Sequence, residues 1–175
     1  MNIRENKQVY PYGCVMLYFD ESDVNNLHSE INPQDLYTEG DGFGIEESPH
    51  CTLLYGLHDD EIDIEDIQEV LDNHTYSTLK AHNLSVFERP NYDVLKYDIK
   101  GKSLKETNDE LKEFPYTSEF PSYHPHMTIA YLKPGRGREY VNELSKKYDE
   151  MLVTPQYAIY SDPKGGKYKL PIQVK

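Results

Sequence analysis

The 175-residue sequence has no tryptophan, two cysteines and no long hydrophobic run. Cys14 and Cys51 lie far apart and neither belongs to a CxxC pair, so the sequence predicts no disulfide framework, in agreement with a reducing cytoplasm. No stretch reaches the roughly 20 apolar residues that span a bilayer, and no apolar segment follows residues 1–7 as a signal peptide requires. We therefore expect a cytoplasmic protein without a membrane segment.

The sequence also lacks positive charge over one long segment. Residues 20–79 contain 17 Asp and Glu and no Lys or Arg, whereas residues 80–175 contain 16 Lys and Arg against 13 Asp and Glu. The net charge of the whole chain is −13. Because the acidic half repels a polyanion, we expect no extended binding of RNA or DNA. A small nucleotide remains a candidate ligand, since a few cations beside a local site suffice to hold it.

A short segment of the chain occurs twice. Residues 49–55 read PHCTLLY and residues 125–131 read PHMTIAY, with four identical positions and one exchange of aliphatic residues. From the 7 His, 8 Thr and 11 Pro of the chain, the pattern Pro-His-x-Thr is expected by chance about 0.02 times. Repetition of a polar motif inside an apolar run indicates a duplicated fold with a shared site.

Both copies have the composition of β-strands, and proline opens each of them. Side chains two positions apart share a face of a strand, so His50 points the same way as Thr52, and His126 the same way as Thr128. Two such pairs facing each other offer one imidazole as a base and one as an acid. The two hydroxyls can hold the non-bridging oxygens of a phosphate between them. This chemistry needs no metal.

A metal site is the alternative interpretation of the second copy. His124 and His126 are two positions apart and could bind one ion together. The sequence has no second close pair of histidines and no CxxC pair to complete such a site. We therefore predict neither a metal nor another cofactor.

Two His-x-Thr motifs on strands, about half a small domain apart, resemble those of the two-histidine (2H) phosphoesterases, also called LigT-like or 2′-5′ RNA ligase-like proteins. The longer strings at 48–57 and 123–131 look most like phage-borne members. The resemblance implies metal-independent cleavage of nucleotide phosphodiesters, carried by the histidine and threonine of each motif. It also implies an α+β fold with pseudo-twofold symmetry, in which two antiparallel β-sheets flank a central cleft and the helices lie outside.

We expect one domain over residues 1–175, with two lobes that hold one motif each. Local patterns predict strands at 13–19, in both motif segments, and at 84–88, 93–100, 153–160 and 168–174. They predict helices at 20–30, capped by Ser22 or Asp23, at 60–73, at 103–114, capped by Ser103, and along a stripe at 141–151. Tyr55 and Tyr131 follow their threonines by three positions, so they are expected to face away from the motif side chains and to pack.

Aromatic and basic residues near the motifs are the expected substrate contacts. A nucleobase stacks on a flat ring, which makes Tyr12 and Tyr123 predicted contacts. Lys133 and Arg136 follow the second motif and are the predicted cations for phosphate. The further candidates are Tyr116, Phe120, Arg138, Lys164, Lys167 and Lys169.

The leading hypothesis is hydrolysis of small cyclic oligonucleotide second messengers, as in phage enzymes of counter-defence, which work in the host cytoplasm. RNA ends with 2′,3′-cyclic phosphates and 2′-5′ linkages are the alternative substrates. A second alternative is a module that sequesters a nucleotide without cutting it. Because the two motifs are nearly symmetric, the sequence leaves open which histidine is the base.

Overall fold

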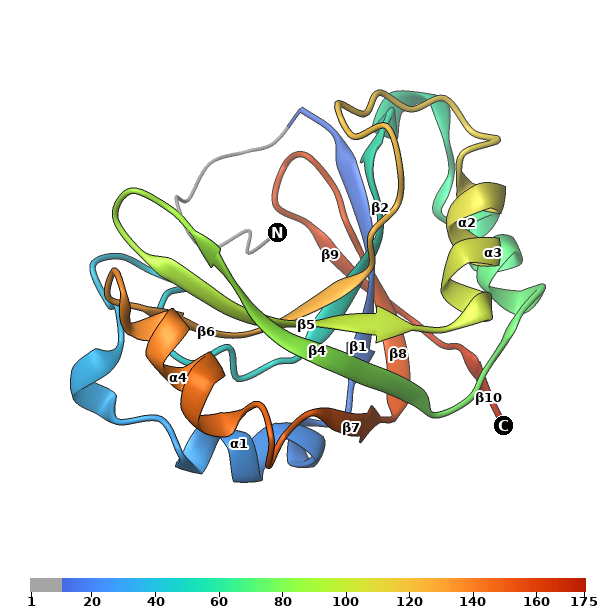
Figure 1. Cartoon of the computed structure of the whole chain (residues 1–175). Helices are drawn as coiled ribbons and strands as arrows, with labels where there is room; N and C mark the ends of the chain where they lie inside the picture. Colours follow the sequence, from blue (N-terminus) through green and yellow to red (C-terminus); the bar gives the residue numbers. More distant parts are fainter. Residues whose placement is uncertain (1–10) are drawn as a thin grey trace.

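The structure is a computed structural model, and it describes residues 11–175 (Figure 1). The expectation for residues 1–7 lies outside the described residues. In chain order the strands are β1 Gly13–Phe19, β2 His50–Leu57, β3 Thr75–Tyr76, β4 Leu79–Glu88, β5 Asp93–Lys100, β6 His126–Leu132, β7 Glu150–Val153, β8 Pro155–Ser161, β9 Lys167–Leu170 and β10 Gln173–Val174. The α-helices are α1 Asn25–Ser29, α2 Ile64–Asp72, α3 Lys102–Leu111 and α4 Arg136–Leu144.

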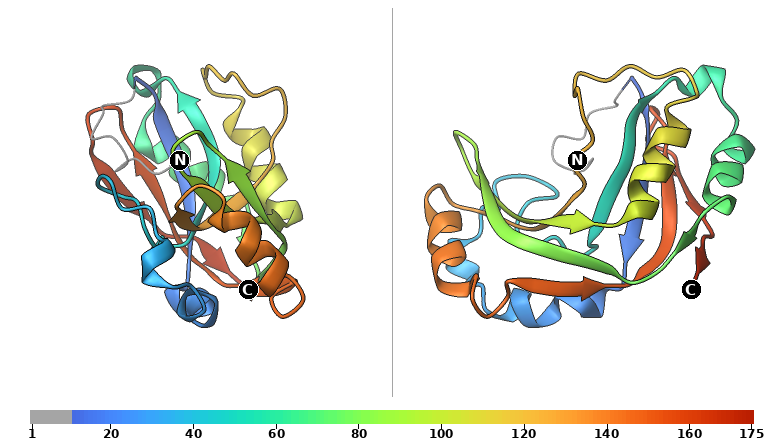
Figure 2. Two further views of the ribbon diagram at one scale, coloured as in Figure 1. Left: turned by 60° about the vertical axis from the view of Figure 1, so that its left-hand side comes forward. Right: turned by 45° about the vertical axis from the view of Figure 1, so that its right-hand side comes forward.

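Eight strands form two four-stranded antiparallel sheets. Sheet A has the order β2-β1-β8-β9 and sheet B has the order β6-β5-β4-β7, so a motif strand lies at one edge of each. Strands β3 and β10 form a separate, short parallel pair. In Figures 1 and 2 helices α2 and α3 lie together at one end, whereas α1 and α4 lie at the other. The predicted α+β fold with two antiparallel sheets is confirmed.

Strand β1 is the buried centre of sheet A. All seven of its residues are buried and apolar. Val15, Leu17 and Phe19 pack in the main core, while Cys14, Met16 and Tyr18 form a second cluster on the opposite face. A strand buried on both faces has a continuous apolar sequence, which explains why residues 13–19 were predictable from composition alone.

The pairing of β2 with β1 contains a β-bulge directly after the motif threonine. Thr52 and Leu54 pair with consecutive residues of β1, which leaves Leu53 as the extra residue. Leu53 and Leu54 both pack in the main core. The extra residue restarts the alternation, and Tyr55 packs in the second cluster, on the face of Thr52. The expectation that Tyr55 faces away from the motif was wrong.

Strand β6 has the same bulge at the equivalent place. Thr128 and Ala130 pair with consecutive residues of β5, so Ile129 is the extra residue. Ile129 and Ala130 belong to the main core, whereas Tyr131 packs edge-on against Phe43, with 5.2 Å between the ring centroids. Tyr131 packs against neighbours as predicted, but it does so on the face of Thr128.

The first two helical segments begin at acidic caps. The segment 20–30 divides into a 3-10 turn at Glu21–Val24 and helix α1, and a side-chain oxygen of Asp20 accepts the N–H of Ser22 at 3.0 Å. The cap is therefore Asp20 rather than either predicted residue. Helix α2 lies inside the predicted range 60–73, and its cap Asp63 donates its N–H to the Asp66 carboxylate at 3.1 Å.

The last two helices differ from their sequence patterns. Helix α3 begins with Gly101 as its cap, so Ser103 lies inside the helix and its carbonyl accepts the hydroxyl of Thr107 at 2.7 Å. Helix α4 begins five residues before the predicted stripe, because the buried Asp93 carboxylate of β5 accepts the N–H groups of Gly135 and Gly137. Met151, the last residue of the predicted stripe, belongs to strand β7.

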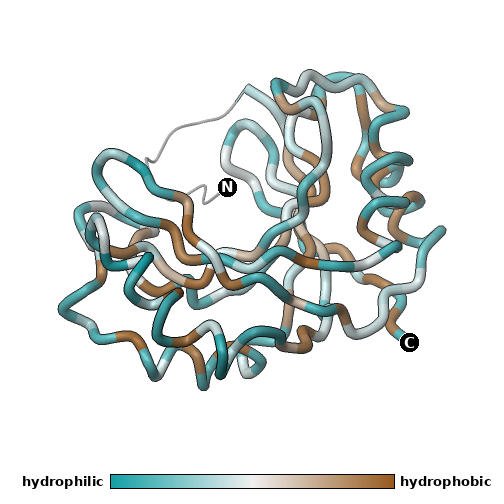
Figure 3. Tube along the Cα trace, viewed as in Figure 1, coloured by the Kyte–Doolittle hydropathy of each residue, from teal (hydrophilic) through white to brown (hydrophobic). Residues whose placement is uncertain are grey.

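The two sheets share one main core. Helix α3 packs beside β2, and α4 packs against β4 and β5. Buried apolar side chains from both sheets and from the helices belong to a single cluster. Figure 3 shows the hydrophobic segments along the central strands and hydrophilic residues at the hairpin tips. No helix in residues 11–175 combines the length and the hydropathy of a membrane-spanning segment.

Candidate active site at the two His-x-Thr strands

His50 is the first residue of β2 and is half-buried. Its Nδ1 lies 2.9 Å from the carbonyl oxygen of Ser48. A carbonyl only accepts, so Nδ1 carries the proton and Nε2 is the basic nitrogen of the neutral ring. The ring also stacks on Tyr18, its register partner on β1, with 4.9 Å between the centroids.

His126 occupies the equivalent position at the start of β6. Its Nδ1 lies 3.1 Å from the carbonyl oxygen of His124, again two residues earlier, so the same tautomer follows. Phe87 of β4 meets the ring edge-on, with 5.6 Å between the centroids. The two motif histidines therefore have the same local hydrogen bond but different ring neighbours.

Each motif threonine shares the face of its histidine, as the strand pattern predicted. Thr52 pairs with Met16 of β1, and Thr128 pairs with Lys96 of β5. These pairs are equivalent in the two sheets, because β1 and β5 are the strands next to the motif strands β2 and β6. An apolar residue therefore lies beside one threonine and a cation beside the other.

The two motif strands lie beside each other, and Tyr123 connects them. The Tyr123 hydroxyl donates to the Thr52 carbonyl at 2.9 Å and lies 3.8 Å from the sulfur of Cys51. Burial raises the pKa of the Cys51 thiol to about 11, and the backbone N–H of His126 donates to the same sulfur. Tyr123, predicted to contact substrate, is partly buried against the main core and holds the two motif segments together.

Sheet B carries a charged pair beside its motif. The ammonium of Lys96 lies 2.7 Å from Asp98, which also accepts from Asn83 at 2.8 Å. Asp98 is the register partner of His126. Burial lowers the pKa of His126, Lys96 lowers it further, and the His124 carbonyl and Asp98 oppose the shift.

Sequence reasoning missed this pair, although one signal for it was available. Lys96 and Asp98 alternate with apolar residues in a strand that is otherwise buried, which is the pattern of two polar side chains on one face. The position of that face beside the second motif depends on the register between β5 and β6. A single sequence does not specify that register.

Sheet A has an aromatic stack in the same place. Tyr18 stacks on His50 and also on Tyr157 of β8, with 5.4 Å between the tyrosine centroids. The ammonium of Lys169, a cation candidate from the sequence, lies over the Tyr157 ring at 4.1 Å. These four residues form a continuous row from the motif edge to strand β9.

Two of the predicted substrate contacts lie far from the motif histidines. Tyr12 precedes β1 and stacks on His58, just beyond the end of β2. His50 pairs with Tyr18, near the opposite end of β1, which is about 20 Å along the strand from Tyr12 at ~3.3 Å per residue. Lys133 follows the last residue of β6, about 20 Å along that strand from its motif histidine by the same estimate. The structure therefore brings neither residue beside the motifs.

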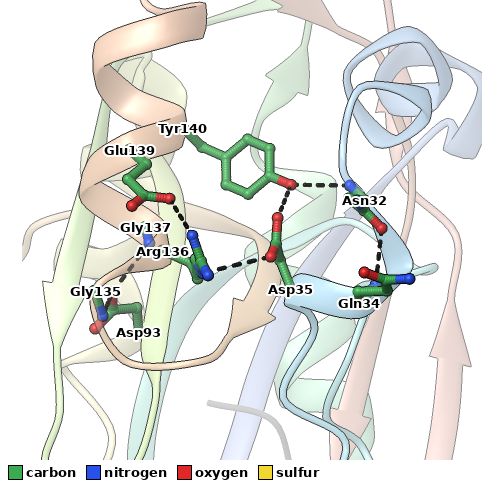
Figure 4. A network of polar contacts seen from close by, with 9 residues as sticks. All are labelled: Asn32, Gln34, Asp35, Asp93, Gly135, Arg136, Gly137, Glu139 and Tyr140. Carbon is green, nitrogen blue, oxygen red and sulfur yellow. Dashed lines mark hydrogen bonds and ion pairs between the residues drawn. The ribbon is translucent and has the colours of Figure 1, made fainter.

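Arg136 belongs to a different polar network, which Figure 4 shows. Its guanidinium lies 2.8 Å from Glu139 and 3.4 Å from Asp35. The Tyr140 hydroxyl donates to Asp35 and accepts the N–H of Asn32 at 2.9 Å. The network joins α4 to the segment after α1, so Arg136 has a structural role here.

The alternative metal site gains no further ligands from the fold. The Nε2 of His124 lies 2.8 Å from the hydroxyl of Ser122. Over residues 11–175, no group of three or more His, Cys, Asp or Glu side chains is arranged to hold a metal ion.

Comparisons with known proteins identify the fold. No family model and no curated protein matches the sequence. Kluyveromyces marxianus Usb1 is similar in structure, with a TM-score of 0.53 at 11% identity over 94% of this chain and 99% of Usb1, and its structure with uridine monophosphate has a TM-score of 0.54 at the same identity and coverage. Escherichia coli LigT with 3′-AMP is less similar, with a TM-score of 0.47 at 10% identity over 93% of this chain and 96% of LigT. The chain therefore has the fold of Usb1 over nearly its whole length.

Proposed function

We propose that the protein is a metal-independent nucleotide phosphodiesterase whose catalytic residues are His50, Thr52, His126 and Thr128. The observation that carries the proposal is the equivalence of the two motif strands. Each lies at the edge of its sheet, has a bulge after the threonine, and hydrogen-bonds its histidine Nδ1 to the carbonyl two residues earlier. A scissile phosphate between the strands would meet one Nε2 and one hydroxyl from each side.

We assign the general base to His126. A base must be neutral before it acts, and burial lowers the pKa of His126, which favours the neutral ring. Its Nε2 would take the proton from water or from a neighbouring 2′-hydroxyl as that oxygen bonds to phosphorus. The hydroxyls of Thr52 and Thr128 would donate to the non-bridging oxygens, where negative charge increases in the transition state.

His50 is then the general acid. As the bond from phosphorus to the leaving ribose oxygen breaks, the protonated imidazole gives that oxygen its proton. The face of Tyr18, on which His50 stacks, carries the negative part of the ring quadrupole and attracts an imidazolium. After the step His126 carries the proton taken from the attacking oxygen, His50 is neutral because its proton has gone to the leaving oxygen, and exchange with solvent restores both rings.

The proposed substrate is a small cyclic oligonucleotide second messenger, as in the phage counter-defence enzymes that the motif strings resemble. The acidic segment 20–79 supports a small ligand over a long one. The alternative substrates are RNA ends with 2′,3′-cyclic phosphates and 2′-5′ linkages. The likeness of the fold to Usb1, whose structure contains a mononucleotide, keeps this alternative open.

The test is chromatography of reactions run in EDTA with cyclic dinucleotides, cyclic trinucleotides, 2′,3′-cyclic AMP and a 2′-5′ adenylate. We expect the wild type to linearise a cyclic oligonucleotide, and we expect His50→Ala/His126→Ala to yield no product. His58→Gln is the matched control, because His58 follows the opposite end of β2. It should retain wild-type activity.

Each other outcome has a defined meaning. Tight retention of one nucleotide without product would favour the sequestering module and contradict the catalytic proposal. Product from 2′,3′-cyclic AMP or the 2′-5′ adenylate alone would replace the proposed substrate and keep the mechanism. Turnover that EDTA abolishes would overturn the metal-free mechanism and make His124→Ala the next variant.

A further inference from the structure

The motif faces of the two sheets differ chemically, although their backbones correspond. In sheet A the strands next to the motif present Met16, Tyr18 and Tyr157. In sheet B the equivalent neighbours on β5 are Lys96 and Asp98. A substrate lying between the two strands would therefore meet an apolar, aromatic wall on one side and a charged wall on the other.

Lys96 is an unusual residue for its position. Within residues 11–175 it is the only Lys or Arg that is buried, with 8% of its surface exposed. Its ammonium is held by Asp98 at 2.7 Å and lies 4.5 Å from the centre of the Phe87 ring. The Asp98 carboxylate is partly exposed, an ion pair at such a site contributes little net stability, and the equivalent position in sheet A is filled by Met16. Packing alone thus does not require a lysine here.

Phe87 is the second unusual residue of this face. It is 40% exposed, lies diagonally across the β4–β5 pairing from Lys96, and meets the His126 ring edge-on. The guanidinium of Arg89 lies 5.9 Å from its ring centre. An exposed ring with cations around it, next to a motif histidine, combines a stacking surface for a nucleobase with charge for its phosphate.

We propose that β4 and β5 form a nucleotide subsite in which Phe87 stacks the base and Lys96 binds the phosphate held by Thr128. Lys96 is the cross-strand neighbour of Thr128, so its charge lies beside the oxygens that this hydroxyl would hold. The ligand class is a nucleoside with one esterified phosphate. The identification of that phosphate as the scissile one rests on the proposed function.

The subsite predicts how the substrate is oriented in the active site. The nucleoside attached to the scissile phosphate would lie on sheet B, with its base beside the general base His126. Sheet A, with its continuous aromatic row ending at Lys169, would receive the other side of the scissile bond. The two histidines would then differ in role because their sheets bind different parts of the substrate.

The experiment measures equilibrium binding of inorganic phosphate, adenosine 3′-monophosphate and adenosine 5′-monophosphate by calorimetry. A phosphodiesterase does not cleave these probes, so the wild-type protein can be used. We expect Phe87→Ala to weaken the tighter adenosine monophosphate about ten-fold and to leave phosphate binding unchanged. Lys96→Met, which copies the residue of sheet A, should weaken phosphate and nucleotide by the same factor of about ten.

Matched controls separate these effects from general destabilisation. Tyr168→Ala removes another exposed ring, on β9, and Lys100→Met removes an exposed lysine of β5. Both should bind all three probes like the wild type. Thermal unfolding of each variant confirms that it is folded under the binding conditions.

The outcomes distinguish the subsite from the proposed function. Wild-type affinity of Phe87→Ala for both nucleotides, wild-type affinity of Lys96→Met for phosphate, or no binding of any probe by the wild type would overturn the subsite. If cyclic nucleotides are cleaved but these variants bind normally, the function stands and the subsite fails. If the variants bind weakly as expected but no substrate is cleaved, the subsite stands without the catalytic proposal.

Discussion

At the residue scale, the two motif histidines are alike in their own bonds and different in what surrounds them. In both, the protonated Nδ1 donates to a backbone carbonyl. Around His126 the charged neighbours on β5 are Lys96 and Asp98, and His82 of β4 pairs with Asp98. The charges that decide the protonation of this ring therefore come from another strand than its own.

The pKa of His126 provides a direct test of this arrangement. Burial and Lys96 hold the pKa below its ordinary value of 6.5, so an NMR titration of the ring should give a midpoint below 6.5. Lys96→Met removes a positive charge that opposes the imidazolium and leaves Asp98 to attract it, so the pKa should rise. The acid limb of kcat/KM should move to higher pH by the same amount. An unchanged midpoint in Lys96→Met would show that burial alone sets the pKa, and Lys100→Met is the control.

At the element scale, local patterns predicted strand and helix types better than their details. The apolar run at 13–19 and the helical spacing of the apolar residues in α2 were sufficient to find these elements. The bulges that turn Tyr55 and Tyr131 toward the motif face were not predictable, because a bulge is defined only relative to the partner strand. The start of α4 was missed for the same kind of reason, since Asp93 caps it from β5.

Gly56 lies in β2, and its carbonyl accepts the N–H of Thr117, in the segment that precedes the second motif, at 2.9 Å. It has φ +113°, and a Cβ there would lie 2.0 Å from the Thr117 carbonyl oxygen. We expect Gly56→Ala to lower the free energy of unfolding by about 3 kcal/mol, from backbone strain and the clash together. Gly165→Ala has a similar positive φ but open space around the Cβ, so it should cost about 1 kcal/mol. Urea unfolding measures both, and equal losses would contradict the clash.

At the scale of the whole molecule, charge separates the chain into two unlike parts. The acidic segment 20–79 includes β2 and α2, while Lys96, the cation beside the second motif, comes from sheet B. Long-range repulsion from a net charge of −13 opposes a polyanion, and a small nucleotide can still be held by a few local cations.

A competition assay tests this consequence of the charge distribution. Single-stranded RNA of about 30 nucleotides, added at physiological salt, should not slow cleavage of a cyclic dinucleotide, because it gains few phosphate contacts on an acidic surface. Raising the salt should change the cleavage rate only weakly. Inhibition by the RNA that disappears steeply with salt would contradict the expectation and indicate an extended basic track.

The repeated motif, the types of most elements and the acidic character of one half follow from the sequence, because they depend on local spacing and composition. Which residues surround the motifs depends on how the chain folds. Arg136, which sequence proximity suggested for phosphate, pairs with Asp35 and Glu139 instead, and Lys96 reaches the motif through the register of β5 with β6. Strand register and ion pairing join residues that are distant in the chain, so neither can be read from spacing along it.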